Sequence, residues 1–179
     1  MSKRVLIISS SPRKDGNSET LAAAFAKGAQ AAGHQVETVY LREKQIGYCK
    51  GCFACHKLGH CVLKDDAAAI TAKMHDADVL VFATPVYYYC VSGQLKTMLD
   101  RANPLFDTDY AFMKAYLLAA AAEDAPETFA GTEKAVQGWV DCFPRCTLAG
   151  TVFAGGVNGV GEIAGHPALE QAYQMGKEV

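Results

Sequence analysis

Hydroxyl-bearing and small residues follow the first apolar run of the sequence. Val5 to Ile8 is apolar, the next residues bring Ser, Pro and Gly, and a helical pattern is under way by Leu21. This order is typical of a strand, a tight loop and a helix N-terminus. Unpaired N–H groups gather at the positive end of a helix dipole, and Ser11, Ser18 and Thr20 add hydroxyl donors. The loop favours a phosphate or another small anion; a loop that binds nothing is the alternative.

Two familiar phosphate-binding loops do not match this sequence. The nucleoside-triphosphate loop requires Gly-x-x-x-x-Gly-Lys-Ser/Thr, and residues 93–97 match it only in part. No Gly-x-Gly-x-x-Gly of the dinucleotide fingerprint follows the first strand. The Gly-rich run from Gly155 to Gly165 lies too late in the chain, because no full β-α-β unit follows it.

Four of the seven cysteines lie close together, in the order Cys-x2-Cys-x2-Cys-x5-Cys. Three thiolates at this spacing reach three corners of a [4Fe–4S] cubane, and the fourth ligand arrives from a short loop. The candidate metal ligands are Cys49, Cys52, Cys55 and Cys61. Three alternatives stay open: zinc, with His56 or His60 as further ligands, a redox disulfide (Cys49–Cys52 or Cys52–Cys55), and an empty box.

Three consecutive tyrosines follow the most apolar strand of the chain. Residues 79–83 form an unbroken apolar run, which is typical of a buried parallel strand. Tyr87, Tyr88 and Tyr89 come shortly after it, and they cannot all face one core. Aromatic walls and backbone donors next to a phosphate site suit a flat, redox-active ring such as isoalloxazine. An aromatic core cluster is the alternative.

Strand-like and helical segments alternate along the chain. We expect strands at 5–8, 36–40, 79–83, 115–122 and 147–153, and helices beginning after 16, at 65, at 93 with Ser92 as its cap, at 132 and at Pro167. This alternation predicts a parallel sheet wrapped on both faces, a doubly wound α/β fold. With strand order 2-1-3-4-5, the loops after the first, third and fourth strands meet where ligands bind such sheets.

Composition narrows the class of protein. The 179 residues carry a net charge of -2 and predict one domain over 1–179, with a Cys-rich loop at 41–64. No basic block offers a nucleic-acid surface, and the apolar runs are too short for a membrane. We expect a cytoplasmic protein. Lys96, Asp100 and Arg101 are expected to form a solvated or subunit-facing charge group on one helix.

Three motifs occur together: Ser-Ser-Pro-Arg-x-x-Gly-Asn-Ser at 10–18, Pro-Val-Tyr-Tyr at 85–88, and Ser-Gly-Gln-Leu-Lys-x-x-x-Asp-Arg at 92–101. With Gly-His-Pro-Ala-Leu at 165–169, they resemble the flavodoxin-like NAD(P)H-dependent FMN reductases, and within these the iron–sulfur flavoproteins. The resemblance covers residues 4 to about 178. It implies a flavodoxin-like three-layer sandwich with a five-stranded parallel sheet in the order 2-1-3-4-5.

The resemblance also implies site residues. The FMN phosphate would be surrounded by Ser11, Arg13, Asn17, Ser18 and Thr20. The flavin ring would be bordered by Pro85, Val86, Tyr87 and Tyr88, and the fourth loop would close the site with Ala121, Ala122 and Glu123. That loop departs from the Gly- or Ser-rich version common in relatives. The four cysteines would hold a [4Fe–4S] cluster close enough to FMN for electron transfer.

The implied function is that of an FMN-dependent oxidoreductase. NAD(P)H would pass hydride to the flavin, and electrons would go on to a quinone, a second flavin, a metal ion or the cluster. A ferredoxin-like protein is an alternative donor, no catalytic side chain is expected, and a homodimer or homotetramer is implied. A flavodoxin-like electron carrier is one alternative, which the net charge of -2 disfavours, since flavodoxins tend to be strongly acidic. A zinc-clipped binding module is the other.

Overall fold

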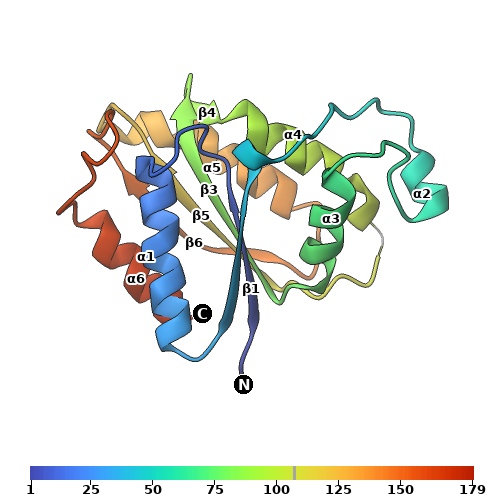
Figure 1. The fold of residues 1–179 in the computed structure, drawn as a ribbon, viewed down its shortest axis with the longest axis horizontal. Coiled ribbons are helices and arrows are strands. Elements are labelled where there is room, and N and C mark those ends of the chain that lie inside the picture. The colour runs from blue at the N-terminus through green and yellow to red at the C-terminus, as the bar shows by residue number, and fades with distance from the viewer. Residues whose placement is uncertain (107) are drawn as a thin grey trace.

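A parallel sheet forms the centre of the protein (Figure 1). The computed structural model describes residues 1–106 and 108–179. Five parallel strands lie in the order β2-β1-β3-β5-β6. Their bounds are β1 (Arg4–Ser9), β2 (Gln35–Tyr40), β3 (Val79–Tyr87), β5 (Lys114–Ala120) and β6 (Thr147–Ala154). The predicted order 2-1-3-4-5 is confirmed, but a sixth strand that was not predicted, β4 (Cys90–Val91), pairs antiparallel with the end of β3.

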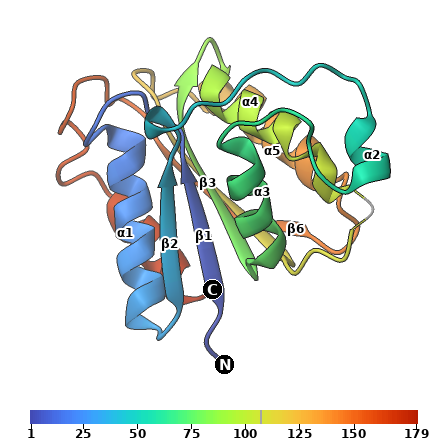
Figure 2. The same ribbon diagram turned by 45° about the vertical axis from the view of Figure 1, so that its right-hand side comes forward.

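Helices cover both faces of this sheet (Figures 1 and 2). One face carries α1 (Asn17–Ala31) and α6 (Ala168–Lys177), and the other carries α3 (Ala67–Asp76), α4 (Gly93–Arg101) and α5 (Pro126–Val140). Three short segments complete the structure: η1 (Leu41–Glu43), α2 (Ala54–Leu58) and η2 (Asn103–Leu105). The predicted flavodoxin-like three-layer sandwich is confirmed. Among the described residues, no helix combines the length and the apolar character needed to cross a bilayer.

Two apolar cores lie on the two faces of the sheet. In β1, Leu6 and Ile8 face the core beneath α3, α4 and α5, whereas Val5 and Ile7 face the core beneath α1 and α6. All four side chains are at most 3% exposed. A strand that is covered on both faces needs apolar residues at consecutive positions, which explains the unbroken apolar runs in the sequence.

Several predicted boundaries were wrong. The helix expected to start at Thr132 begins at Pro126. Proline fits the first turn of a helix, because the N–H that it lacks would have no acceptor within the helix at that position. Thr132 is buried inside that helix. Strand β3 runs on to Tyr87, four residues past Ala83, because its end pairs with β4.

Glycines let α1 and α6 approach closely. A Cβ atom at Gly28 would lie 1.9 Å from the carbonyl oxygen of Tyr173, and one at Gly176 would lie 2.1 Å from that of Phe25. Both obstacles are backbone atoms, which cannot move aside as a flexible side chain would. The packing of the C-terminal half of α1 against α6 therefore requires glycine at both positions.

We expect Gly28→Ala to lower the free energy of unfolding by about 1–3 kcal/mol, because the added methyl group forces the two helices apart. Gly138→Ala is the matched control: position 138 is an exposed helical site with nothing within 4 Å of an added Cβ. That change should raise stability by up to about 1 kcal/mol through helix propensity. Urea unfolding measures both, and a Gly28→Ala protein as stable as wild type contradicts the close packing.

Candidate functional site

The loop between β1 and α1 ends in a helix start without a side-chain cap. Gly16 occupies the N-cap position and has no side chain to accept hydrogen bonds from the first turn. The first N–H groups of α1 have no acceptor within the helix. A Cβ atom at position 16 would lie 2.5 Å from Ser11 Oγ, so the loop closes this tightly only around glycine. These free donors and the helix dipole fit a bound phosphate.

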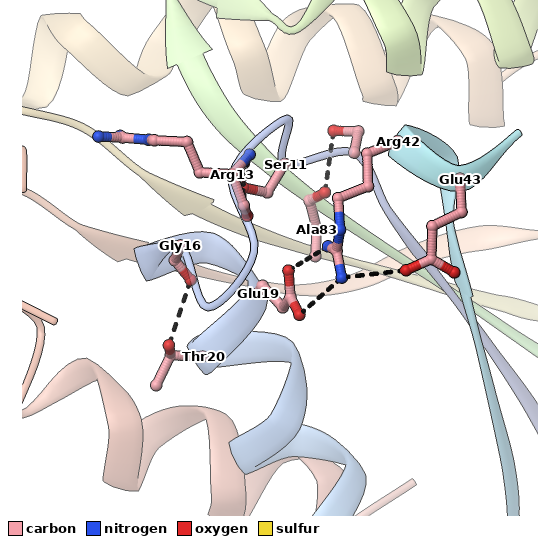
Figure 3. A network of polar contacts seen from close by, with 9 residues as sticks. Ser11, Arg13, Gly16, Glu19, Thr20, Arg42, Glu43 and Ala83 are labelled. Carbon is pink, nitrogen blue, oxygen red and sulfur yellow. Dashed lines mark hydrogen bonds and ion pairs between the residues drawn. The ribbon is translucent and has the colours of Figure 1, made fainter. Parts of the chain in front are cut away.

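The predicted phosphate residues occupy different places around this helix start. Ser11 and Ser18 are 3% and 2% exposed, and Ser11 Oγ donates to the Arg13 carbonyl oxygen at 2.8 Å. Thr20 Oγ1 donates back to the Gly16 carbonyl oxygen at 3.2 Å (Figure 3). The Arg13 side chain is exposed and extends away from the loop in Figure 3. Phosphate contacts of these residues stay predictions.

Asn17 links the loop to a distant part of the chain. Its Nδ2 donates to the Gly159 carbonyl oxygen at 3.0 Å, and its Oδ1 accepts from the Ile163 N–H at 3.3 Å. The Gly-rich stretch 155–165, which cannot be a dinucleotide loop, therefore lies against the phosphate loop. This role was not predicted, since the partners are more than 140 positions away in the sequence.

An ion pair at the start of α1 was also missed. Arg42, which follows β2, pairs with Glu19 in the first turn of α1 and contacts Glu43 Oε1 at 3.3 Å (Figure 3). Its guanidinium lies 4.6 Å from the centre of the Tyr40 ring. Arg42 neutralises the Glu19 carboxylate, which lies next to the candidate phosphate site at the start of α1, and it links the end of β2 to this helix.

The tyrosines form the tip of a β-hairpin. Val86 pairs with Val91 and Tyr87 with Cys90, which leaves Tyr88 and Tyr89 as the two turn residues. Their φ angles are 49° and 61°. Two-residue hairpin turns require positive φ, which usually selects Asn or Gly, and bulky residues in this region are strained. Such strain clusters at functional sites.

None of the three tyrosines packs in the core. Tyr87 is 40% exposed, Tyr88 100% and Tyr89 54%. The aromatic core cluster, the alternative to a ligand-facing loop, is therefore wrong for these residues. Of the other predicted ring contacts, Pro85 and Ala121 are buried, Val86 is half-buried, and Ala122 and Glu123 are exposed.

Buried hydroxyls join the base of the hairpin to the phosphate loop. Ser92 Oγ donates to Ser10 Oγ at 2.9 Å, and Ser10 Oγ donates to the Ala83 carbonyl oxygen at 3.0 Å. The Ser92 N–H donates to Thr84 Oγ1 at 3.0 Å. Ser92 Oγ also accepts from the Leu95 N–H, so its predicted role as the cap of α4 is confirmed. These hydrogen bonds form one network that fixes the positions of the two loops relative to each other.

Glu123 holds the tip of the hairpin against α5. Its Oε2 accepts from the Tyr89 hydroxyl at 3.1 Å and from Thr128 Oγ1 at 2.9 Å. A Cβ atom at Gly131 would lie 2.2 Å from the Tyr89 carbonyl oxygen, so the turn rests directly on this helix. The hydrogen bond to the Glu123 carboxylate raises the pKa of Tyr89 above its ordinary value.

The four cysteines of the box line one pocket of about 480 Å³. Its other walls come from η2 and the ends of α4 and α5, including Leu99, Trp139 and Phe143. Asn103 Nδ2 donates to Cys55 Sγ at 3.1 Å. Within residues 1–106 and 108–179, no three His, Cys, Asp or Glu side chains converge on a position for one metal ion. The cysteines thus share a pocket without forming a closed single-ion site.

The expectation that Arg101 belongs to an exposed charge group on α4 is wrong. Lys96 and Asp100 do form an exposed ion pair at 2.7 Å. Arg101, which was grouped with them, is 1% exposed and pairs with Asp65 at 2.6 Å. Position 101 falls on the inner face of α4, so its charge required a buried partner.

The hairpin and the cysteine pocket lie at opposite ends of α4. Ser92, at the base of the hairpin, caps the start of α4, whereas Leu99 to Ala102 line the pocket at its end. Nine helical residues span about 13 Å. Figure 2 likewise shows α2 on the opposite side of the molecule from α1. In one chain, the α4 residues that line the cysteine pocket are thus about a helix length from Ser92, whereas Tyr48, which precedes Cys49, lies near Gly93 and Gln94 at the start of α4.

Comparisons with known proteins cover both regions. The sequence pattern of the family described as NADPH-dependent FMN reductase matches residues 3–159. An iron-sulfur flavoprotein from Methanosarcina thermophila is 32% identical over 168 residues, which span 94% of this chain and 85% of that protein. An iron-sulfur flavoprotein from Archaeoglobus fulgidus is 39% identical over 94 residues, which span 52% of this chain but only 43% of that relative.

A solved structure shares the fold. The NAD(P)H:quinone oxidoreductase from Methanothermobacter marburgensis superposes with a TM-score of 0.77 and 19% identity, over 99% of this chain and 96% of that one. At this identity the likeness concerns the fold alone.

We expect Glu123→Gln to lower the pKa of Tyr89 toward the ordinary value of about 10, because the negative charge that disfavours the ionised phenol is removed. In the wild type, Tyr89 should stay protonated to a higher pH. The wild type and Glu123→Gln are each titrated in the ultraviolet with and without the additional change Tyr89→Phe. The difference between the two curves of each pair reports the Tyr89 phenol alone. An unchanged difference titration would show that the contact is not formed in solution.

Proposed function

Because the chain belongs to the NADPH-dependent FMN reductase family, we propose that it is an FMN-dependent oxidoreductase that takes hydride from NAD(P)H. The observation that carries the proposal is the start of α1, where Gly16 leaves the first N–H groups without a side-chain acceptor. Two buried serines stand beside those donors. A phosphorylated cofactor satisfies the donors and the dipole together.

The residues of the chain bind and orient the cofactor. The helix start and Ser11 receive the phosphate, and the hairpin at Pro85–Tyr89 borders the ring. Bound FMN supplies the redox chemistry, by accepting hydride from the nicotinamide and passing electrons to a second substrate. No side chain is required as an acid or base. The buried hydrogen bond between Ser10 and Ser92 fixes the distance between the loop that would bind the phosphate and the hairpin that would border the ring.

Exposed aromatic rings at the hairpin also suggest how the second substrate is recognised. The acceptor we favour is a quinone or a flavin, whose flat ring suits a site bordered by tyrosines. We propose a cytoplasmic protein that forms a homodimer or homotetramer, because the three tyrosines of the hairpin are exposed in a single chain and a second chain would cover them. Size-exclusion chromatography with light scattering tests the assembly.

Anaerobic mixing with NADPH tests the main proposal. We expect protein saturated with FMN to lose its flavin absorbance rapidly, whereas a non-enzymatic flavodoxin-like carrier keeps it. Gly16→Ala should weaken FMN binding about tenfold, because the added methyl group collides with Ser11 Oγ and displaces the donors. Gly138→Ala, the same change at an open position, should leave binding unaltered. Failure of the wild-type protein to bind FMN overturns the proposal.

We further propose that Cys49, Cys52, Cys55 and Cys61 hold a [4Fe–4S] cluster. Four thiolates in one largely apolar pocket are the donor set that such clusters take, and both relatives described above carry the name iron-sulfur flavoprotein. The cluster would supply one-electron transfer. A ferredoxin-like protein is a candidate electron donor to it.

Metal and sulfide analysis of anaerobically prepared protein tests the cluster. We expect about four iron and four inorganic sulfide per chain. Cys52→Ser should lose most of both and keep FMN, whereas Cys90→Ser, which changes an exposed cysteine outside the box, should keep the iron and the sulfide. Zinc without sulfide, a Cys49–Cys52 or Cys52–Cys55 disulfide, or an empty box contradicts the cluster.

A further inference from the structure

The segment that carries the four cysteines is closed at its neck. The Gln45 N–H donates to Asp66 Oδ2 at 2.7 Å, and the Asp66 N–H donates to the Gln45 carbonyl oxygen at 3.1 Å. One step further in, the Gly47 N–H donates to Asp65 Oδ2 at 2.9 Å. Residues 45–47 and 65–66 therefore lie side by side, and all four cysteines belong to the loop between them.

Arg101 joins the two sides of this neck. Its Nη1 donates to the Gly47 carbonyl oxygen at 2.7 Å and to Asp65 Oδ2 at 2.6 Å. Its Nη2 donates to Asp65 Oδ1 at 2.8 Å, which completes a two-pronged contact with the carboxylate. The planar guanidinium offers this fork, and a lysine ammonium does not. The Arg101 side chain is fully buried, and the Asp65 side chain is 16% exposed, so water has limited access to these bonds.

Arg101 also belongs to the wall of the cysteine pocket. The hydrogen bonds that Arg101 donates to the Asp65 carboxylate raise the pKa of Arg101. Its Nε is buried and has no hydrogen-bond partner among the described residues. A fixed positive charge with a spare donor therefore stands at the pocket in which the thiolates gather.

We propose that Arg101 is the positioning residue of the cysteine box: it locks the neck of the loop and places its charge beside the thiolates. The inference rests on the proposed cluster only for its redox part. Reduction adds one electron, and so one negative charge, to the cluster and its ligands, and a nearby guanidinium stabilises that charge. Arg101 should therefore raise the reduction potential.

Trypsin tests the neck without any cluster. Lys50, Lys57 and Lys64 are exposed cleavage sites within the loop. In cluster-free protein, Arg101→Met should increase the cleavage rate about tenfold, because local opening becomes easier. Lys96→Met is the matched control, since Lys96 lies on the same helix in an exposed pair. It should be cut like wild type. FMN content reports whether each variant has folded.

Protein that carries the cluster tests the effect of the Arg101 charge on the reduction potential. In Arg101→Met, the cluster should be reduced at a lower potential in a dithionite titration followed by electron paramagnetic resonance, and iron per chain should fall. Arg101→Lys, which keeps the charge and loses the fork, should recover the potential and remain sensitive to trypsin; it also replaces Arg101→Met if that variant does not fold. Wild-type protein without iron would overturn the cluster and leave the trypsin test valid. An Arg101→Met protein with wild-type trypsin resistance or wild-type potential overturns the inference.

Discussion

The direct pairing of β1 with β3 is the constraint on which the candidate flavin site depends. Their register runs from Val5 beside Val79 to Ser9 beside Ala83, where β1 ends and β3 continues to Tyr87. The chain leaves β1 toward α1 on one face and leaves β3 toward α4 on the other. In doubly wound sheets, ligands bind where two such connections part. The loop after β1 and the hairpin at the end of β3 both leave the sheet at this edge, and the Ser10 N–H donates to the Ala83 carbonyl oxygen at 2.9 Å and joins their bases.

Features with local causes could be predicted from the sequence. The apolar run of β3 reflects burial on both faces, Ser92 caps α4 because its hydroxyl reaches an N–H three residues on, and glycine with serines marks the start of α1. The alternation of strand-like and helical segments predicted the doubly wound parallel sheet. Each of these patterns involves residues that are neighbours in the chain, so one stretch of sequence contains the whole cause.

Features that join distant residues could not be predicted in this way. Arg101 bonds to Gly47 and Asp65, which lie 54 and 36 positions away, and nothing near position 101 reveals either partner. Asn17 matches a phosphate-loop motif, yet its amide links two loops. The hairpin turn was missed because Tyr88 and Tyr89 replace the Asn and Gly that usually announce positive φ. The roles of these four residues depend on contacts that exist only in the folded chain.

The glycine at the start of α1 has a consequence for the life of the protein in a cell. A helix start without a side-chain cap is less stable than one capped by serine or aspartate. A ligand that binds only the folded state recovers that loss in proportion to the logarithm of its free concentration. If that ligand is FMN, the rate at which cellular proteases degrade the protein then depends on the free FMN concentration. Cells poor in flavin would degrade it sooner than cells rich in flavin.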